Sequence, residues 1–128
     1  MKIQLASLAL MGAVLGAAPA SAEGVDLWRV SGKVAGVAFV MDCRFEPPAA
    51  QFGGACTEVS RSNGGGQAGA VHKLTRGAVT GNQISWTYQT SFLISRFDVT
   101  FTGLLDGGHM AGAVDAAGRK GDFTGVKN

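Results

Sequence analysis

The stretch that decides the fold is QISWTYQTSFLISRFDVTFTGL, residues 83–104. Large apolar and polar residues alternate through both of its halves, and a short apolar run separates the halves. Because successive side chains of a β-strand point to opposite faces, this alternation predicts two strands, each with one dry and one wet face. Such strands favour antiparallel pairing. The predicted dry face comprises Ile84, Trp86, Tyr88, Phe97, Val99 and Phe101.

Similar strand patterns recur on both sides of this stretch, with turn residues every eight to twelve positions. No segment after residue 22 keeps a helical period over three turns. Residues 91–95, which contain the apolar run, are expected to form a short cap over an open end. The eight predicted strands are Asp26–Lys33, Val37–Glu46, Phe52–Ser60, Ala70–Arg76, Gln83–Gln89, Arg96–Leu104, His109–Asp115 and Asp122–Lys127.

The turns between these strands are short and rich in glycine, of which the chain has 20. Glycine, Asn and Asp tolerate the positive φ of tight turns, as in Thr80-Gly81-Asn82 and Asp106-Gly107-Gly108. Consecutive strands joined in this way form a meander, and closure into a barrel removes both of its edges. We therefore predict an all-β fold, a single antiparallel up-and-down eight-stranded β-barrel over residues 23–128. The alternative is a two-sheet β-sandwich.

Residues 1–22 have the pattern of an export signal peptide. Lys2 provides the positive start, Ile3–Leu15 is an apolar run that is short for a membrane span, and Ala20-Ser21-Ala22 provides the small residues of a cleavage site. We expect a mature domain of residues 23–128 in the periplasm or secreted medium, with no membrane span in the mature chain.

Cys43 and Cys56 are the only two cysteines, and an even count in an exported domain favours a disulfide bond. If the two residues lie opposite each other, the turn falls near Pro47–Gln51 and the disulfide joins two neighbouring strands. This register places Glu58 on the same side as Met41. Either the register is shifted, or this end of the inner face is wet.

Several motifs resemble those of small exported barrels. An early tryptophan strand (Trp28), the strand end Gly54-Ala55-Cys56, a central Trp86 strand and the closing Gly121–Thr124 strand are similar to the avidin-like group. Trp28 together with Cys43 and Cys56 is similar to the periplasmic metalloprotease-inhibitor barrels. Both resemblances imply an exported eight-stranded barrel, an outline that lipocalins share. Biotin binding is not implied, because only Ser31 of the polar set required for biotin stands near the first strand.

Composition and motifs argue against several functions. The formal net charge is +2 and the basic residues are dispersed, so we expect no nucleic-acid partner. No Gly-x-Ser-x-Gly elbow or His-Glu-x-x-His helix is present, so we predict no enzyme activity and no cofactor. A metal site would require His72 and His109 to converge with Asp98 or Asp106. We instead expect two surface imidazoles and no metal.

The apolar inner face either fills the barrel or lines a cavity, since eight-stranded barrels do both. We predict a non-enzymatic exported barrel that binds a small, largely apolar ligand in one mouth. The alternative is a protein-binding module, such as an inhibitor of an exported hydrolase, that uses loops Pro47–Phe52, Ser60–Gln67 and Phe92–Ser95. A structural envelope protein is a third possibility. The predicted ligand-binding residues are Phe39, Met41, Trp86, Tyr88, Phe97 and Phe101, with Arg96 or His109 at the rim.

Overall fold

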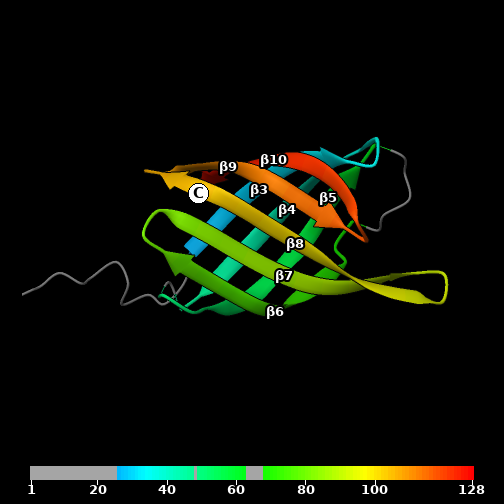
Figure 1. Cartoon of the computed structure of the whole chain (residues 1–128), viewed down its shortest axis with the longest axis horizontal. Helices are drawn as coiled ribbons and strands as arrows, with labels where there is room; N and C mark the ends of the chain where they lie inside the picture. Colours follow the sequence, from blue (N-terminus) through cyan, green and yellow to red (C-terminus); the bar gives the residue numbers. More distant parts are fainter. Residues whose placement is uncertain (1–25, 48, 63–67) are drawn as a thin grey trace, which may run out of the picture.

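The computed structural model describes residues 26–47, 49–62 and 68–128, which form one closed sheet (Figure 1). The predicted export signal and the glycine-rich run at 63–67 lie outside the described residues. The strands are β3 (Asp26–Val34), β4 (Val37–Glu46), β5 (Gly53–Arg61), β6 (Val71–Thr80), β7 (Gln83–Phe92), β8 (Ser95–Asp106), β9 (His109–Ala116) and β10 (Arg119–Lys127).

The strand order is that of an up-and-down barrel. Each strand pairs antiparallel with its neighbours along the chain, and β10 pairs with β3 to close the sheet. The predicted eight-stranded barrel is therefore confirmed, and the two-sheet sandwich is wrong. Closure follows from the meander, because pairing of the terminal strands satisfies backbone groups that two free edges would leave open.

The β7–β8 hairpin is longer than predicted. The two strands stay paired up to Phe92 and Ser95, so the hairpin projects beyond the body of the barrel (Figure 1). At its tip Phe92, Leu93 and Ile94 are 69%, 86% and 98% exposed. The prediction that this run caps an open end is therefore wrong, because continued strand pairing carries the run away from the barrel mouth.

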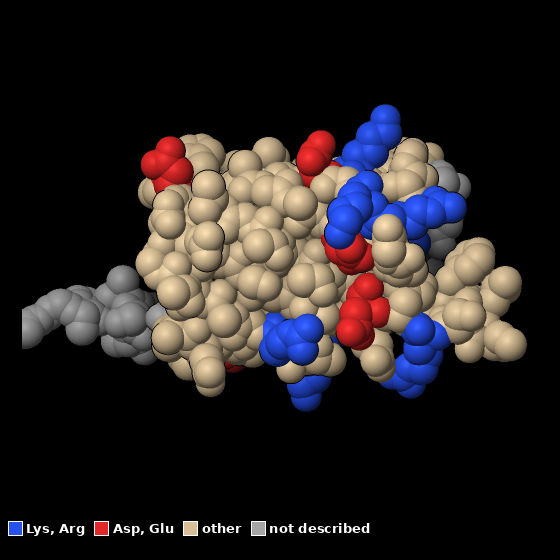
Figure 2. Space-filling model, viewed as in Figure 1, with Lys and Arg blue, Asp and Glu red and all other residues tan. Residues whose placement is uncertain are grey.

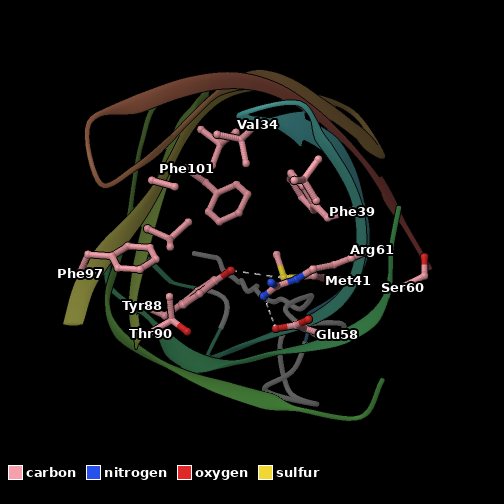
Figure 3. Close-up of a pocket in the computed structure, with 14 residues that line it drawn as sticks. Val34, Phe39, Met41, Glu58, Ser60, Arg61, Tyr88, Thr90, Phe97 and Phe101 are labelled. Atoms are coloured by element: carbon pink, nitrogen blue, oxygen red, sulfur yellow. Dashed lines mark hydrogen bonds and ion pairs between the residues drawn. The ribbon is translucent and has the colours of Figure 1, made fainter. Parts of the chain in front are cut away.

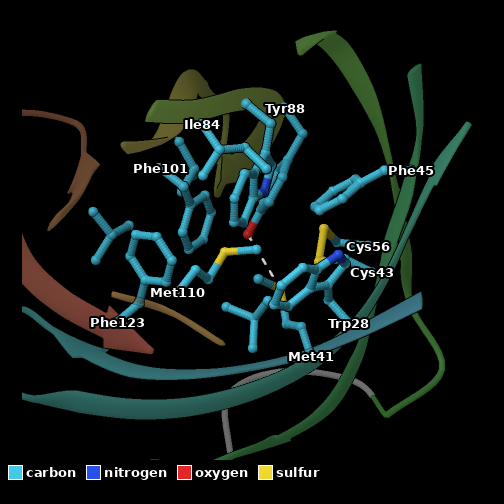
Figure 4. Close-up of a cluster of buried hydrophobic side chains, with 14 of the residues drawn as sticks. Trp28, Met41, Cys43, Phe45, Cys56, Ile84, Tyr88, Phe101, Met110 and Phe123 are labelled. Atoms are coloured by element: carbon cyan, nitrogen blue, oxygen red, sulfur yellow. Dashed lines mark hydrogen bonds between the residues drawn. A yellow bond between two sulfur atoms is a disulfide. The ribbon is translucent and has the colours of Figure 1, made fainter. Parts of the chain in front are cut away.

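Aromatic side chains fill the middle of the barrel (Figure 4). Trp86 is fully buried and stacks on Phe101, with ring centroids 4.8 Å apart and planes 8° from parallel. Phe123 meets Trp86 edge-on at 5.5 Å, and Phe45 lies against it at 4.9 Å. The predicted dry face thus forms a packed core at this level of the barrel, with Phe97 only partly buried at one end.

The disulfide Cys43–Cys56 joins β4 and β5, as predicted. The two residues are directly opposite each other in the sheet, and Met41 lies opposite Glu58 on the same side. The predicted register is correct, so the inward position of Glu58 reflects a polar region within the barrel.

The segment that precedes β5 packs at one end of the barrel, where it helps to line a second cavity of about 270 Å³. Strands β5 and β6 pair over only three residues of each strand, which leaves a gap in the sheet. Phe52 crosses this gap, where its backbone N–H donates to the Gly77 carbonyl at 3.1 Å and its ring packs on Phe45 at 4.8 Å. Gly77 has no side chain to obstruct the ring, since a Cβ there would lie 2.4 Å from it. The segment therefore continues the sheet beside β6, and it lines the second cavity without closing this end of the barrel.

Candidate functional site

A cavity of about 170 Å³ opens at the opposite end of the barrel, near the β3–β4 turn and the base of the β7–β8 hairpin (Figure 3). Most of its wall is apolar, and the polar residues come from β5 and β7. The apolar lining residues are Val34, Val37, Phe39, Met41, Phe97, Val99, Phe101, Val114 and Ala116. The polar lining residues are Glu58, Ser60, Arg61, Tyr88 and Thr90.

Five of the eight predicted site residues line this cavity. They are Phe39, Met41, Tyr88, Phe97 and Phe101.

The other three predicted site residues lie elsewhere, and each has a physical reason. Trp86 is below the cavity floor in the packed core. Arg96 has the opposite strand parity from Phe97, so its side chain is outside the barrel, where it donates to Gln89 at 2.5 Å. His109 begins β9 at the other end of the barrel, opposite Asp106. Neither Arg96 nor His109 is therefore a rim residue of this cavity.

A β-bulge in β5 brings Arg61 into the cavity. Met41 pairs with Glu58 while Val40 pairs with Ser60, so Val59 is an extra residue in β5. In a regular strand, residues three apart point to opposite faces. The extra residue restores the parity, so Arg61 and Glu58 both point inward (Figure 3). Bulges commonly re-aim side chains in this way.

Glu58 is the centre of a largely buried polar cluster. Only 6% of this residue is exposed, and Oε2 accepts a hydrogen bond from Arg61 Nη2 at 2.8 Å. His72 Nε2 lies 2.5 Å from the same oxygen, because β6 places His72 opposite Cys56. A buried carboxylate requires such partners to offset the loss of hydration. His72 is thus not the surface imidazole that we predicted.

Tyr88 joins this cluster to the apolar wall. Its ring stacks on His72 with centroids 4.6 Å apart, and its hydroxyl donates to the Met41 Sδ at 3.5 Å. Burial, reinforced by the negative charge of Glu58, raises the pKa of the Tyr88 hydroxyl far above its usual value. A phenol hydroxyl is already protonated at neutral pH, so Tyr88 is a hydrogen-bond donor inside the barrel.

The geometry suits binding of a ligand more readily than a metal ion. Within residues 26–47, 49–62 and 68–128, no group of three or more His, Cys, Asp or Glu side chains could hold a metal. An apolar compartment with a few convergent polar groups is the usual composition of a small-molecule site. In the same described ranges, no helix is long and apolar enough to cross a membrane.

Sequence reasoning missed most of the polar half of the site. The predicted disulfide register already placed Glu58 on the inner face. This was the one feature of the sequence that indicated a polar region inside the barrel. No feature of the sequence indicated that Arg61 points inward, because its orientation depends on the bulge. Ser60 is the last residue of its predicted strand, and Thr90 lies one residue beyond the predicted end of its strand.

No protein-family model, curated protein sequence or solved structure matches this chain significantly. The resemblance to avidin-like and metalloprotease-inhibitor barrels is therefore limited to shared architecture, a small antiparallel barrel of eight strands.

Proposed function

We propose that this protein is exported and binds a small, largely apolar ligand in the open cavity, without catalysing a reaction. The observation that carries this proposal is a cavity of about 170 Å³ with a mainly apolar wall, next to a tightly packed aromatic core. A void of this kind forfeits packing contacts that a ligand would supply. An engineered apolar cavity of about 150 Å³ holds benzene, so the ligand body has on the order of six to eight carbon atoms.

Thermal unfolding in the presence of small apolar metabolites tests this proposal. A ligand at 100 times its dissociation constant adds about 2.7 kcal/mol to the free energy of unfolding. For a domain of this size the melting temperature then rises by roughly 10–20 °C. The control is Ala116→Phe, which places a ring in the cavity and should remove the shift. A library without effect on the wild type, or an equal shift in the control, would exclude this cavity as the site.

A second candidate function rests on the tip of the β7–β8 hairpin. Four of the five two-residue turns in the described chain are built from small residues, Ala35-Gly36, Gly81-Asn82, Gly107-Gly108 and Ala117-Gly118. The fifth is Leu93-Ile94, in which Leu93 has a φ of 59°. Ala35 and Ala117 share this conformation, each with a φ of 54°, so the fifth turn differs from the others in its two large apolar side chains. Figure 2 shows this tip as an uncharged projection, with Lys and Arg side chains on the neighbouring part of the face.

We propose that this hairpin tip contacts a protein partner, since large apolar side chains exposed at a turn add nothing to the packing of the barrel and lower its solubility. The double variant Leu93→Gly/Ile94→Asn copies the Gly81-Asn82 turn and should melt no lower than the wild type. A protein that co-purifies one-to-one with the wild type should be purified and tested again for binding. The wild type and an Arg61→Gln variant should both bind it, and the tip variant should not. Retention of the partner by the tip variant, or the absence of any one-to-one partner, would contradict the assignment.

A further inference from the structure

We infer that the ligand carries a carboxylate group, which Arg61 and Tyr88 bind at the polar side of the cavity. This inference rests on the proposed function and names the class of ligand. It follows from which hydrogen-bonding groups the cavity presents and which of them the protein already uses.

The donors of the cavity are largely unused. A guanidinium group has five N–H donors, and in the described part of the chain Arg61 donates to Glu58 through Nη2. Its side chain is 35% exposed and lines the cavity, so the remaining donors can reach a ligand. The Tyr88 hydroxyl donates to a thioether sulfur, which is a weak acceptor. In Figure 3 the Arg61 guanidinium and the Tyr88 hydroxyl point toward the same region of the barrel interior.

The acceptors of the cavity are occupied or shielded. Glu58 Oε2 faces both Arg61 and His72. Glu58 Oε1 is shielded from solvent and has no partner among the described residues, so a bound molecule does not reach it in this arrangement. The Thr90 hydroxyl can donate or accept and does not discriminate, and Ser60 lies on the outer side of its strand (Figure 3). The cavity therefore favours a ligand group that accepts hydrogen bonds over one that donates them.

The Glu58 cluster also prepares Arg61 for an anion. The hydrogen bond between Arg61 and Glu58 holds the guanidinium inside the barrel, which reduces the ordering cost of binding. The charge of Glu58 is shared between two partners, since His72 lies 2.5 Å from the same oxygen. A planar guanidinium fork matches a carboxylate in a bidentate arrangement. One guanidinium and one phenol suit a single carboxylate at the end of an apolar chain.

Three eight-carbon probes with different head groups test the inference: octanoate, octanol and octylamine. Isothermal titration calorimetry with the mature protein should give an affinity for octanoate at least tenfold higher than for the other two. Tyr88→Phe keeps the ring on His72 and removes only the hydroxyl, and Arg61→Gln removes the charge. Each variant should lose at least tenfold in octanoate affinity, with octanol binding unchanged. The matched control, Arg96→Gln, removes a positive charge outside the barrel and should leave octanoate binding unchanged.

The outcomes separate this inference from the proposed function. Equal binding of octanol and octanoate, or tightest binding of octylamine, would overturn the carboxylate assignment and leave the apolar cavity as the site. A preference for octanoate that persists in both Tyr88→Phe and Arg61→Gln would overturn it too. Failure of all three probes to bind would count against both proposals. The melting temperature of each variant reports whether it is folded. If Arg61→Gln does not fold, Tyr88→Phe alone tests the inference.

Discussion

Replacing Trp86 with alanine should lower the free energy of unfolding by about 3–5 kcal/mol, the cost typical of deleting a large buried aromatic side chain. Trp86 is completely buried, and its ring contacts Phe45, Phe101 and Phe123 with centroid distances of 4.8–5.5 Å. Its removal leaves a void below the floor of the cavity that the surrounding closed sheet cannot readily collapse to fill. Urea unfolding, with the slope against denaturant checked for constancy, measures the effect.

Trp86→Phe is the matched control for this prediction. Phenylalanine keeps a ring against Phe101, and it removes an indole N–H that has no hydrogen-bond partner among the described residues. The loss of stability should therefore be clearly smaller than in Trp86→Ala. A cost below about 1 kcal/mol for alanine would mean that Trp86 is not central to the core. If the alanine variant does not fold, Trp86→Leu provides an intermediate step in the same series.

Reduction of the Cys43–Cys56 disulfide should lower stability by about 3 kcal/mol, because the bond closes a short loop and restricts the unfolded chain. For a domain of this size the melting temperature should fall by roughly 10–20 °C. Strand β5 is especially dependent on the bond, since it pairs with β6 over only three residues of each strand. Amide exchange should therefore increase most in β5, and octanoate binding should weaken because β5 supplies Glu58 and Arg61.

The control for reduction is the double variant Cys43→Ala/Cys56→Ala, which the reductant should not affect. Its melting temperature should already be close to that of the reduced wild type. Equal melting of the oxidised and reduced wild type would show that the disulfide contributes nothing to stability. Uniform amide exchange over all strands would contradict the particular dependence of β5.

Most of the architecture could be predicted because its signals are local. Alternation of the kind seen at Ile84, Trp86 and Tyr88 reports the strand and its buried face together, since side chains alternate at every residue. Glycine-containing turns placed the strand ends near their observed positions. The main error was at Phe92–Ile94, where apolar character suggested burial and strand pairing instead carried the run into solvent.

The candidate site was only half predictable, and the division follows the type of residue. Phe39, Met41 and Phe101 were identified because inward apolar positions follow from strand parity. Arg61 was missed, because strand parity alone points it away from Glu58. The bulge at Val59 depends on how β5 pairs with β4, which no local pattern in β5 reveals.

The sequence alone determined the eight strands, their buried faces and the Cys43–Cys56 disulfide, and it favoured a closed barrel over a two-sheet sandwich. Each of these follows from residue alternation, turn chemistry or cysteine count. Only the tertiary structure decided that Phe52 packs on Phe45 at one end, that an apolar cavity opens at the other, and that Arg61 turns inward beside Glu58 and His72. These features depend on pairing between strands and on the space left between side chains, which are properties of the assembled barrel and of no single segment.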